Sequence, residues 1–266
     1  MSTNADSLRG RVALVTGAGR GIGQAVARGL AARGANVAVL ARSTEQVIDT
    51  VTSISALACA RRGDAVAVPA DVADSDQVSD ALKWIEHRWG SVDILINNAG
   101  VVSPLGASTS INPDEWARAM TVNVTAAARL TFTVLPAMLT AGWGRIVNVS
   151  SGIAANPAGM LRANAYATSK AALESHTLNL AAELAETGVT VNVYRPGSVD
   201  TAMQAYIRYQ DPDRIGTALH ERFVTRHAAG TLLSAEQTAT SLLSRIGGQA
   251  TGQIWDAGDP LANDNT

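Results

Sequence analysis

The stretch Thr16-Gly17-Ala18-Gly19-Arg20-Gly21-Ile22-Gly23 decides the fold of this chain. It follows a short apolar run, residues 12–16, and opens a longer run with helical periodicity. Glycine lets the backbone approach a phosphate closely, and a helix N-terminus offers free N–H groups and a partial positive charge. The glycines fit the spacing G-x-x-x-G-x-G and not G-x-G-x-x-G. The stretch predicts a dinucleotide-binding turn, although a tight strand–helix turn without a ligand fits the same letters.

The rest of the chain alternates short β-branched runs with longer helix-like runs. The predicted strands are Val12–Thr16, Asn36–Ala41, Ala65–Ala70, Ile94–Asn97, Arg145–Ser150, Val189–Tyr194 and Gln253–Asp256. The predicted helices are Gly21–Arg33, Ser43–Arg62, Ser75–Trp89, Pro113–Ala141, Ala165–Glu186 and Ala235–Ile246. The first six strands are apolar on both faces, as expected between two helix layers. The pattern predicts an α/β fold, a Rossmann-like doubly wound parallel sheet of about seven strands with helices on both faces.

Composition limits the classes of protein and partner. The chain has 266 residues, of which 47% are hydrophobic, and a net charge of −2. This balance predicts one domain over residues 1–266 and gives no general attraction to nucleic acid or to an anionic membrane. The polar N-terminus lacks the apolar run of a signal peptide, and we expect no membrane span. A single cysteine, Cys59, allows no internal disulfide. A cytoplasmic protein with a small-molecule substrate is therefore expected.

One segment breaks the alternation. Residues 201–230 are polar, helix-compatible and rich in Arg, His and Tyr, and they follow the sixth strand. A long insertion at the carboxyl end of a strand is where α/β folds place substrate lids. We therefore expect this segment to cover the substrate.

The end of the second strand indicates which cofactor binds. NAD sites usually place an acid there for the ribose 2′-hydroxyl, whereas an arginine suits a 2′-phosphate. This chain has Ala41-Arg42-Ser43 at that point, and Arg20 in the glycine turn could reach the same phosphate. NADP(H) is thus favoured over NAD(H). Asp71 and Val72, after the third strand, could flank the adenine, although Asp71 also suits a turn or cap.

At this point the sequence resembles a known family, the classical short-chain dehydrogenases/reductases. The resemblance runs from about Arg11 to Gly258. It rests on the glycine turn, Asn97-Asn98-Ala99-Gly100, Asn123, Ser150-Ser151, Tyr166-x-x-x-Lys170 and Pro196-Gly197. Each motif is weak alone, but their order and spacing together are specific.

Tyr166 and Lys170 can be weighed without the family. Residues i and i+4 share a helix face, so the ammonium can lie beside the phenol. A free tyrosine has a pKa of about 10, too high for a base at neutral pH. A nearby cation stabilises the phenolate, and the positive charge of an oxidised nicotinamide would add to that effect. The pair therefore suits proton exchange with a substrate oxygen, although a surface Tyr and Lys would share the spacing.

The resemblance implies the remaining roles. Ser151 would bind the substrate oxygen, with Ser150 as a minor alternative, and Lys170 would also hold the nicotinamide ribose. Asn123 would anchor a water that links Lys170 to solvent. The implied cofactor-binding residues are Gly17, Arg20, Gly21, Ile22, Gly23, Arg42, Asp71, Val72, Asn98, Ala99, Gly100, Tyr166, Lys170, Pro196, Gly197, Val199 and Thr201. Asn98 could instead tie neighbouring strands together.

The expected reaction is a hydride transfer between a nicotinamide and a carbonyl or secondary alcohol carbon, with Tyr166 as proton donor or acceptor. A 3-oxoacyl-thioester reductase and a non-catalytic NADP(H)-binding sensor are the alternatives. A nucleotide-sugar epimerase would need a larger C-terminal domain. Fourteen residues separate Ser151 from Tyr166, slightly more than the family usually shows, which predicts a small bulge over the substrate pocket. Arg162 within it could meet substrate or solvent.

Two further expectations concern metals and assembly. The four histidines show no metal-ligand spacing, so no catalytic metal is expected. His220 and His227 lie in residues 201–230 and could touch substrate or serve at the surface. The helices that carry Asn123 and Tyr166 have more apolar surface than one sheet face can cover. We expect a homo-oligomer, which the family resemblance makes a tetramer or a dimer.

Overall fold

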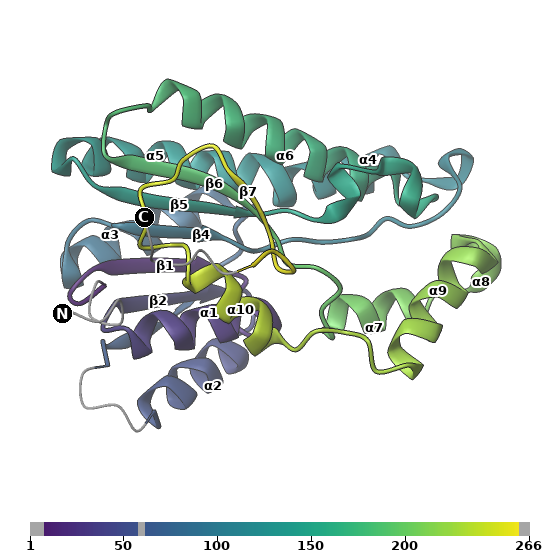
Figure 1. Cartoon of the computed structure of the whole chain (residues 1–266), viewed down its shortest axis with the longest axis horizontal. Coiled ribbons are helices and arrows are strands. Elements are labelled where there is room, and N and C mark those ends of the chain that lie inside the picture. Colours follow the sequence, from purple (N-terminus) through teal and green to yellow (C-terminus); the bar gives the residue numbers. More distant parts are fainter. Residues whose placement is uncertain (1–7, 58–61, 261–266) are drawn as a thin grey trace.

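The computed structural model describes residues 8–57 and 62–260. Cys59, part of the polar N-terminus and the tail from Leu261 onward lie outside the described residues. Seven parallel strands form one sheet in the order β3-β2-β1-β4-β5-β6-β7 (Figure 1). The strands are β1 (Val12–Thr16), β2 (Asn36–Ala41), β3 (Ala65–Pro69), β4 (Ile94–Asn97), β5 (Gly144–Val149), β6 (Val189–Arg195) and β7 (Ile254–Asp256). The predicted doubly wound parallel sheet is confirmed.

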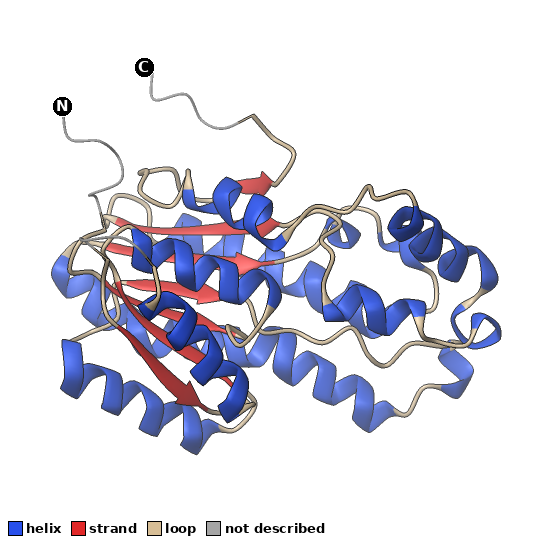
Figure 2. Ribbon diagram, turned by 90° about the horizontal axis from the view of Figure 1, so that it is seen from below, coloured by secondary structure: helices blue, strands red, loops and turns tan. Residues whose placement is uncertain are grey.

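Two helix layers cover the sheet, one on each face (Figures 1 and 2). One layer contains α1 (Gly21–Ala32), α2 (Thr44–Ser55) and α10 (Ala235–Leu243). The other contains α3 (Ser75–Trp89), α4 (Pro113–Met120), α5 (Ala126–Ala141) and α6 (Asn164–Glu183). Each layer closes its own apolar core, which for the first includes Leu30 and Leu242 and for the second Leu130 and Leu180. Burial of these side chains on both faces holds the sheet in place.

Two expectations about single elements were wrong. The helix predicted over residues 43–62 ends at Ser55, with Ala56 as its C-terminal cap. In β3 only Val68 is buried, although this strand was expected to be covered on both faces. β3 lies at one edge of the sheet, so it has a neighbouring strand on one side only.

The predicted helix over residues 113–141 is continuous but not uniform. A π-helical segment, Thr121–Thr125, joins α4 to α5. Over its 29 residues the helix is long and apolar enough to cross a membrane by length and composition, with a mean hydropathy of 1.4 in its most apolar window. The expectation of no membrane span stays a prediction, because a helix that packs in a protein core passes the same test. The helix packs on the sheet, because Leu130, Val134 and Met138 enter the apolar core of that layer.

Residues 201–230 fold into three helices beyond the carboxyl ends of the strands (Figure 2). These are α7 (Ala202–Arg208), α8 (Pro212–Ile215) and α9 (Thr217–Ala228). They share a third apolar cluster with Tyr166 and Met160, to which they contribute Ile207, Ile215 and Leu219. This cluster holds residues 201–230 over the carboxyl ends of the strands, where the glycine turn follows β1.

Candidate active site

One continuous cavity of about 1010 Å³ lies at the carboxyl edge of the sheet. It extends from the glycine turn to α9 and is at the upper end of the volumes usual for cofactor and substrate sites. All the residues predicted for the cofactor line it except Gly23. Of the four residues predicted for catalysis, Ser151, Tyr166 and Lys170 line it and Asn123 does not. The described residues hold no group of three or more His, Cys, Asp or Glu side chains that could bind a metal ion.

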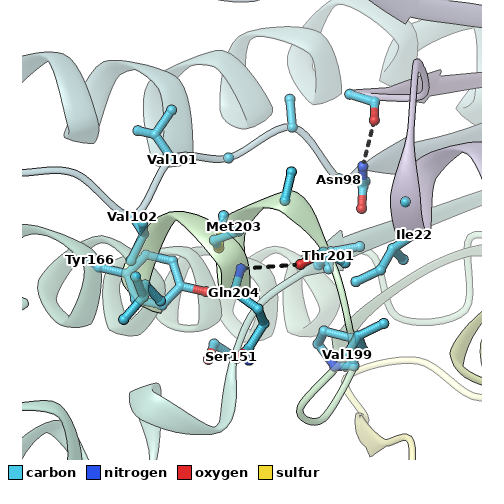
Figure 3. Close-up of a pocket in the computed structure, with 18 of the residues that line it drawn as sticks. Ile22, Asn98, Val101, Val102, Ser151, Tyr166, Val199, Thr201, Met203 and Gln204 are labelled. Atoms are coloured by element: carbon cyan, nitrogen blue, oxygen red, sulfur yellow. Dashed lines mark hydrogen bonds between the residues drawn. The ribbon is translucent and has the colours of Figure 1, made fainter. Parts of the chain in front are cut away.

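Two glycines of the turn, Gly17 and Gly23, have no room for a side chain. Gly17 has φ +62°, and an added Cβ would lie 2.9 Å from the Ala99 Cα atom. At Gly23 an added Cβ would lie 2.4 Å from the Gly17 carbonyl oxygen. This explains why residue 23 is a glycine although it does not line the cavity. The side chain of Asn98 donates to the Thr16 and Gly17 carbonyl oxygens at 2.9 and 3.2 Å, and Figure 3 draws one of these two bonds. Asn98 therefore ties β1 to β4, as the structural alternative predicted, and at the same time shapes the cradle.

Two cations face the cavity beside this turn. Arg20 and Arg42 are both exposed, and neither has an ion-pair partner among the described residues. Asp71 lines the same cavity but has other partners: its carboxylate accepts from the Ala73 backbone N–H at 2.9 Å and pairs with Arg118 at 3.4 Å. Of the two structural roles considered for Asp71, the structure shows the turn, whereas Asp74 caps α3. This side of the cavity thus suits a dinucleotide, because its glycines allow a phosphate to lie close to the backbone and its two arginines suit a second phosphate.

Tyr166 and Ser151 meet on the opposite wall of the cavity (Figure 3). The Tyr166 hydroxyl interacts with the Ser151 side chain, and the Ser151 oxygen also accepts from the Ile153 backbone N–H at 3.4 Å. Burial raises the pKa of Tyr166, while the bond with Ser151 acts to lower it. Ser150 is 2% exposed and directs its hydroxyl to the Lys170 carbonyl oxygen at 3.5 Å. Between the two serines, the structure therefore favours Ser151 as the partner of Tyr166.

Lys170 lies under Tyr166, one turn further along α6. Its Nζ atom is 5.8 Å from the centre of the Tyr166 ring and donates to the Val149 carbonyl oxygen at 2.7 Å. Burial lowers the pKa of Lys170 to about 8, and the charge of Glu174 acts to raise it. Glu174 is itself fixed by Arg195, with contacts of 2.8 and 2.7 Å. Sequence reasoning missed this ion pair, because only the folded chain places the end of β6 beside α6.

Asn123 lies in the π-helical segment and is 1% exposed. Its side chain accepts from the Val101 N–H at 2.8 Å, and donates to the Val101 carbonyl oxygen and the Ser169 hydroxyl, both at 2.9 Å. These bonds use both amide donors. A π bulge often occurs at a functional site, and here Asn123 joins the loop that follows β4, at Val101, to α6, at Ser169. The expected water relay through Asn123 stays a prediction.

The interval between Ser151 and Tyr166 forms two short 3-10 helices, Gly152–Ala154 and Pro157–Met160. Asn156 and Met160 from this interval line the cavity, in agreement with the predicted bulge. Arg162 does not face substrate space: it donates to the carbonyl oxygens of Asp213 and Arg214 and so ties the interval to α8. His220 contacts the Arg208 carbonyl oxygen at 3.0 Å within residues 201–230.

Several lining residues had no signal in the sequence. They come from α2 and from residues 198–226, and include Gln46, Ser198, Met203, Gln204, Arg222, Phe223 and Arg226. The polar pattern of residues 201–230 predicted a lid but did not indicate which side chains would face inward.

With this geometry established, comparison with known proteins identifies the family. The family model described as short chain dehydrogenase matches residues 11–212. The chain belongs to the short-chain dehydrogenase family. It is 36% identical over 251 residues to 2,3-dihydro-2,3-dihydroxybenzoate dehydrogenase of Bacillus subtilis, covering 93% of each chain. It is also 36% identical over 200 residues to a 3-oxoacyl-[acyl-carrier-protein] reductase of Pseudomonas aeruginosa, covering 74% of this chain and 77% of the relative.

A solved structure agrees with this assignment. A protein of Beutenbergia cavernae, described as an NAD(P)-dependent gluconate 5-dehydrogenase with NADP bound, superposes with a TM-score of 0.81 and 32% identity. The match covers 95% of this chain and 97% of that one. This short-chain dehydrogenase is accordingly an NAD(P)-dependent oxidoreductase that transfers a hydride between a nicotinamide and a carbonyl or secondary alcohol.

Proposed function

We propose that this short-chain dehydrogenase prefers NADP(H) and uses Tyr166 to exchange a proton with the oxygen of a ketone or secondary alcohol. The observation that carries the proposal is the meeting of Tyr166, Ser151 and Lys170 in one cavity with the glycine turn. When bound, the nicotinamide supplies the hydride in reduction and takes it up in oxidation.

In this proposal the cofactor binds at the glycine wall, the side of the cavity formed by the glycine turn of residues 17–23 with Arg20 and Arg42. Gly17 and Gly21 allow the pyrophosphate to lie close to the backbone, and Arg20 and Arg42 bind the 2′-phosphate. Support comes from the exposure of both guanidinium groups and from the absence of an acid at the end of β2, where NAD sites usually place one. Other proposed contacts come from Ile22, Val72, Asn98, Ala99, Gly100, Pro196, Gly197, Val199 and Thr201.

The proton chemistry follows from the environment of Tyr166. Because burial raises its pKa, the phenol is protonated at neutral pH, which is the form that donates a proton to a carbonyl oxygen during reduction. Ser151 donates a hydrogen bond to the same oxygen and stabilises the charge that develops there. Lys170 stabilises the phenolate that remains. Each turnover joins one hydride to the carbonyl carbon and one proton to its oxygen, and oxidation reverses both steps.

The substrate is covered by residues 201–230 in this proposal. The helices α7 and α9 place Met203, Ile207 and Phe223 along the cavity near Tyr166. These side chains exclude water from the reacting oxygen, which strengthens the electrostatic contacts around it.

We also propose that the enzyme is a homo-oligomer, a tetramer or a dimer, joined through α5 and α6. Phe132 is 58% exposed, and Leu139 and Leu178 are 40% and 36% exposed. Only 33% of the most apolar window of residues 113–141 is buried within one chain. An apolar area of this kind on neighbouring helices is typical of subunit contacts.

Turnover of simple carbonyl compounds tests the proposed function. NADPH oxidation is followed at neutral pH with a panel of ketones and with a 3-oxoacyl thioester. Turnover of ketones supports the proposal, whereas exclusive turnover of the thioester supports the 3-oxoacyl-thioester reductase that the Pseudomonas aeruginosa relative suggests. Tight NADPH binding without turnover of any carbonyl compound contradicts catalysis and supports a sensor. The cytoplasmic location stays a prediction.

A further inference from the structure

Cations without carboxylate partners line the cavity at two separate places. The first is the glycine wall with Arg20 and Arg42. The second is α9, where Arg222 and Arg226 face the cavity and form no ion pair with any residue the structure describes. The carboxylates that line the cavity are paired with other arginines: Asp71 with Arg118, Asp200 with Arg208 and Asp256 with Arg195. The second pair of cations has no role in the cofactor site proposed above.

The helix α9 holds its two arginines over the substrate end of the cavity. Leu219 and Phe223 anchor the helix in the apolar cluster that contains Tyr166. Arg222 and Arg226 lie one turn apart on an adjoining stripe of the same helix. Arg222 donates to the Gly159 carbonyl oxygen in the interval between Ser151 and Tyr166, so it spans the cavity from the lid to the opposite wall.

The two guanidinium groups are not neutralised by the protein. Burial lowers the pKa of Arg222, and the positive charge of Arg226 adds to that effect. Within the part of the chain that the structure describes, the Arg226 guanidinium donates only to the Ser198 hydroxyl, at 3.0 Å. A guanidinium offers five donors in a planar fork that fits a carboxylate, so a hydroxyl and a carbonyl oxygen leave most of this capacity unused. An anion between the two arginines would relieve their repulsion.

We infer that the substrate is an anionic carbonyl or hydroxy compound, an oxo or hydroxy acid whose carboxylate binds Arg222 with help from Arg226. The reacting carbon then lies at Tyr166 and Ser151, and the body of the molecule lies against apolar side chains such as Val102, Ile153, Met160 and Phe223. This inference rests on the proposed oxidoreductase function, because it names the substrate class for the same site.

Matched acids and esters test the inference. The probes are short- and medium-chain oxo acids and their methyl esters, which keep the shape and remove the charge. In the unmodified enzyme kcat/KM for the best acid should exceed that for its ester by at least about tenfold, the scale of one charge-assisted bidentate contact. In Arg222→Gln this ratio should fall to about 1, and Arg222→Lys should restore part of it, because the charge returns without the planar fork.

A control separates local recognition from net charge. Lys83 on α3 is 73% exposed, pairs with Asp80 and does not line the cavity, so Lys83→Gln removes one positive charge away from the cavity. The acid-to-ester ratio should stay the same in this variant. A ratio near 1 in the unmodified enzyme, or an unchanged ratio in Arg222→Gln, overturns the inference.

Two binding measurements keep the inference apart from the proposed function. Calorimetry of the NADP⁺-loaded protein with the same oxo acids should show binding that weakens at least about tenfold in Arg222→Gln. This result supports the carboxylate site even if no carbonyl compound is turned over, whereas equal binding to both proteins overturns it. The Kd for NADPH should change less than about twofold in Arg222→Gln. A large increase would mean that Arg222 reads the cofactor, which also overturns the inference while leaving oxidoreductase activity with esters intact.

Discussion

The Lys170 ammonium donates a 2.7 Å hydrogen bond to the Val149 carbonyl oxygen at the carboxyl end of β5. This contact fixes a buried cation under the Tyr166 ring, 5.8 Å from its centre. Burial disfavours the charged form of Lys170, which lowers its pKa from 10.5 to about 8. Keeping the ammonium charged in the folded protein therefore reduces the free energy of unfolding. The site is therefore built at the expense of stability, as in other proteins whose function needs buried charges.

Lys170→Met should make the protein more stable at pH 7 when no nucleotide is added. The lowered pKa corresponds to about 3 kcal/mol, and loss of the bond to Val149 reduces the expected gain to about 2 kcal/mol. The pKa is lower in the folded protein than in the unfolded chain, so the folded protein binds fewer protons between pH 8 and 10.5 and the unmodified protein gains stability as the pH rises through that range. The advantage of the variant should thus shrink toward pH 10.5.

Urea unfolding at pH 7, 9 and 10.5 measures this difference. Lys83→Met, at a side chain that is 73% exposed, is the control and should change the free energy of unfolding by less than about 0.5 kcal/mol. An unmodified protein that is as stable as Lys170→Met at pH 7 would show that burial of the ammonium carries no cost.

Tyr166→Phe should lower kcat by about 100- to 10,000-fold, the usual contribution of a positioned acid or base. The ring remains in the apolar cluster, so the fold and the glycine wall should persist. The Kd for NADPH, measured by fluorescence titration, should stay within several-fold of the unmodified value. Turnover that survives in Tyr166→Phe would refute the proton-exchange role.

Ala41→Asp combined with Arg42→Ala should shift cofactor preference toward NADH by at least about tenfold. The change removes one partner of the 2′-phosphate and adds a carboxylate that accepts from the ribose 2′-hydroxyl. The ratio of kcat/KM for NADPH to that for NADH measures the shift. Lys83→Ala is the control, because it removes one positive charge from an exposed position that does not line the cavity. An unchanged ratio in the double variant would place recognition of the 2′-phosphate elsewhere.

Phe132→Arg should dissociate the proposed oligomer. A charged side chain in an apolar contact loses its hydration without gaining a partner, which costs several kcal/mol at an interface. Light scattering after gel filtration gives the mass of the particle. Ile48→Arg on α2, where the side chain is 50% exposed on another face, should leave the mass unchanged. Equal masses for Phe132→Arg and the unmodified protein would exclude this helix pair as the contact.

Much of the fold could be predicted, because the signals that carry it are local. Apolar runs of four to seven residues that alternate with helical runs require buried parallel strands, whichever side chains they contact later. Two glycines of the turn have a local reason: Gly17 and Gly21 adopt φ angles of +62° and +57°, which favour glycine whatever packs nearby. Tyr166 and Lys170 share a face because a helix repeats every 3.6 residues. Periodicity and backbone freedom can be recognised in one segment at a time.

Contacts between distant segments could not be predicted in this way. The choice of Ser151 over Ser150 as the partner of Tyr166, and the pairing of Glu174 with Arg195, depend on how α6 docks against β5 and β6. The bridge from Arg222 to Gly159 depends on where α9 settles over the cavity. Sequence alone determined the alternating elements, the glycine turn and the tyrosine–lysine pair. Only tertiary packing decided which polar groups became partners, because a side chain's partner is set by the position of a whole element and not by its neighbours along the chain.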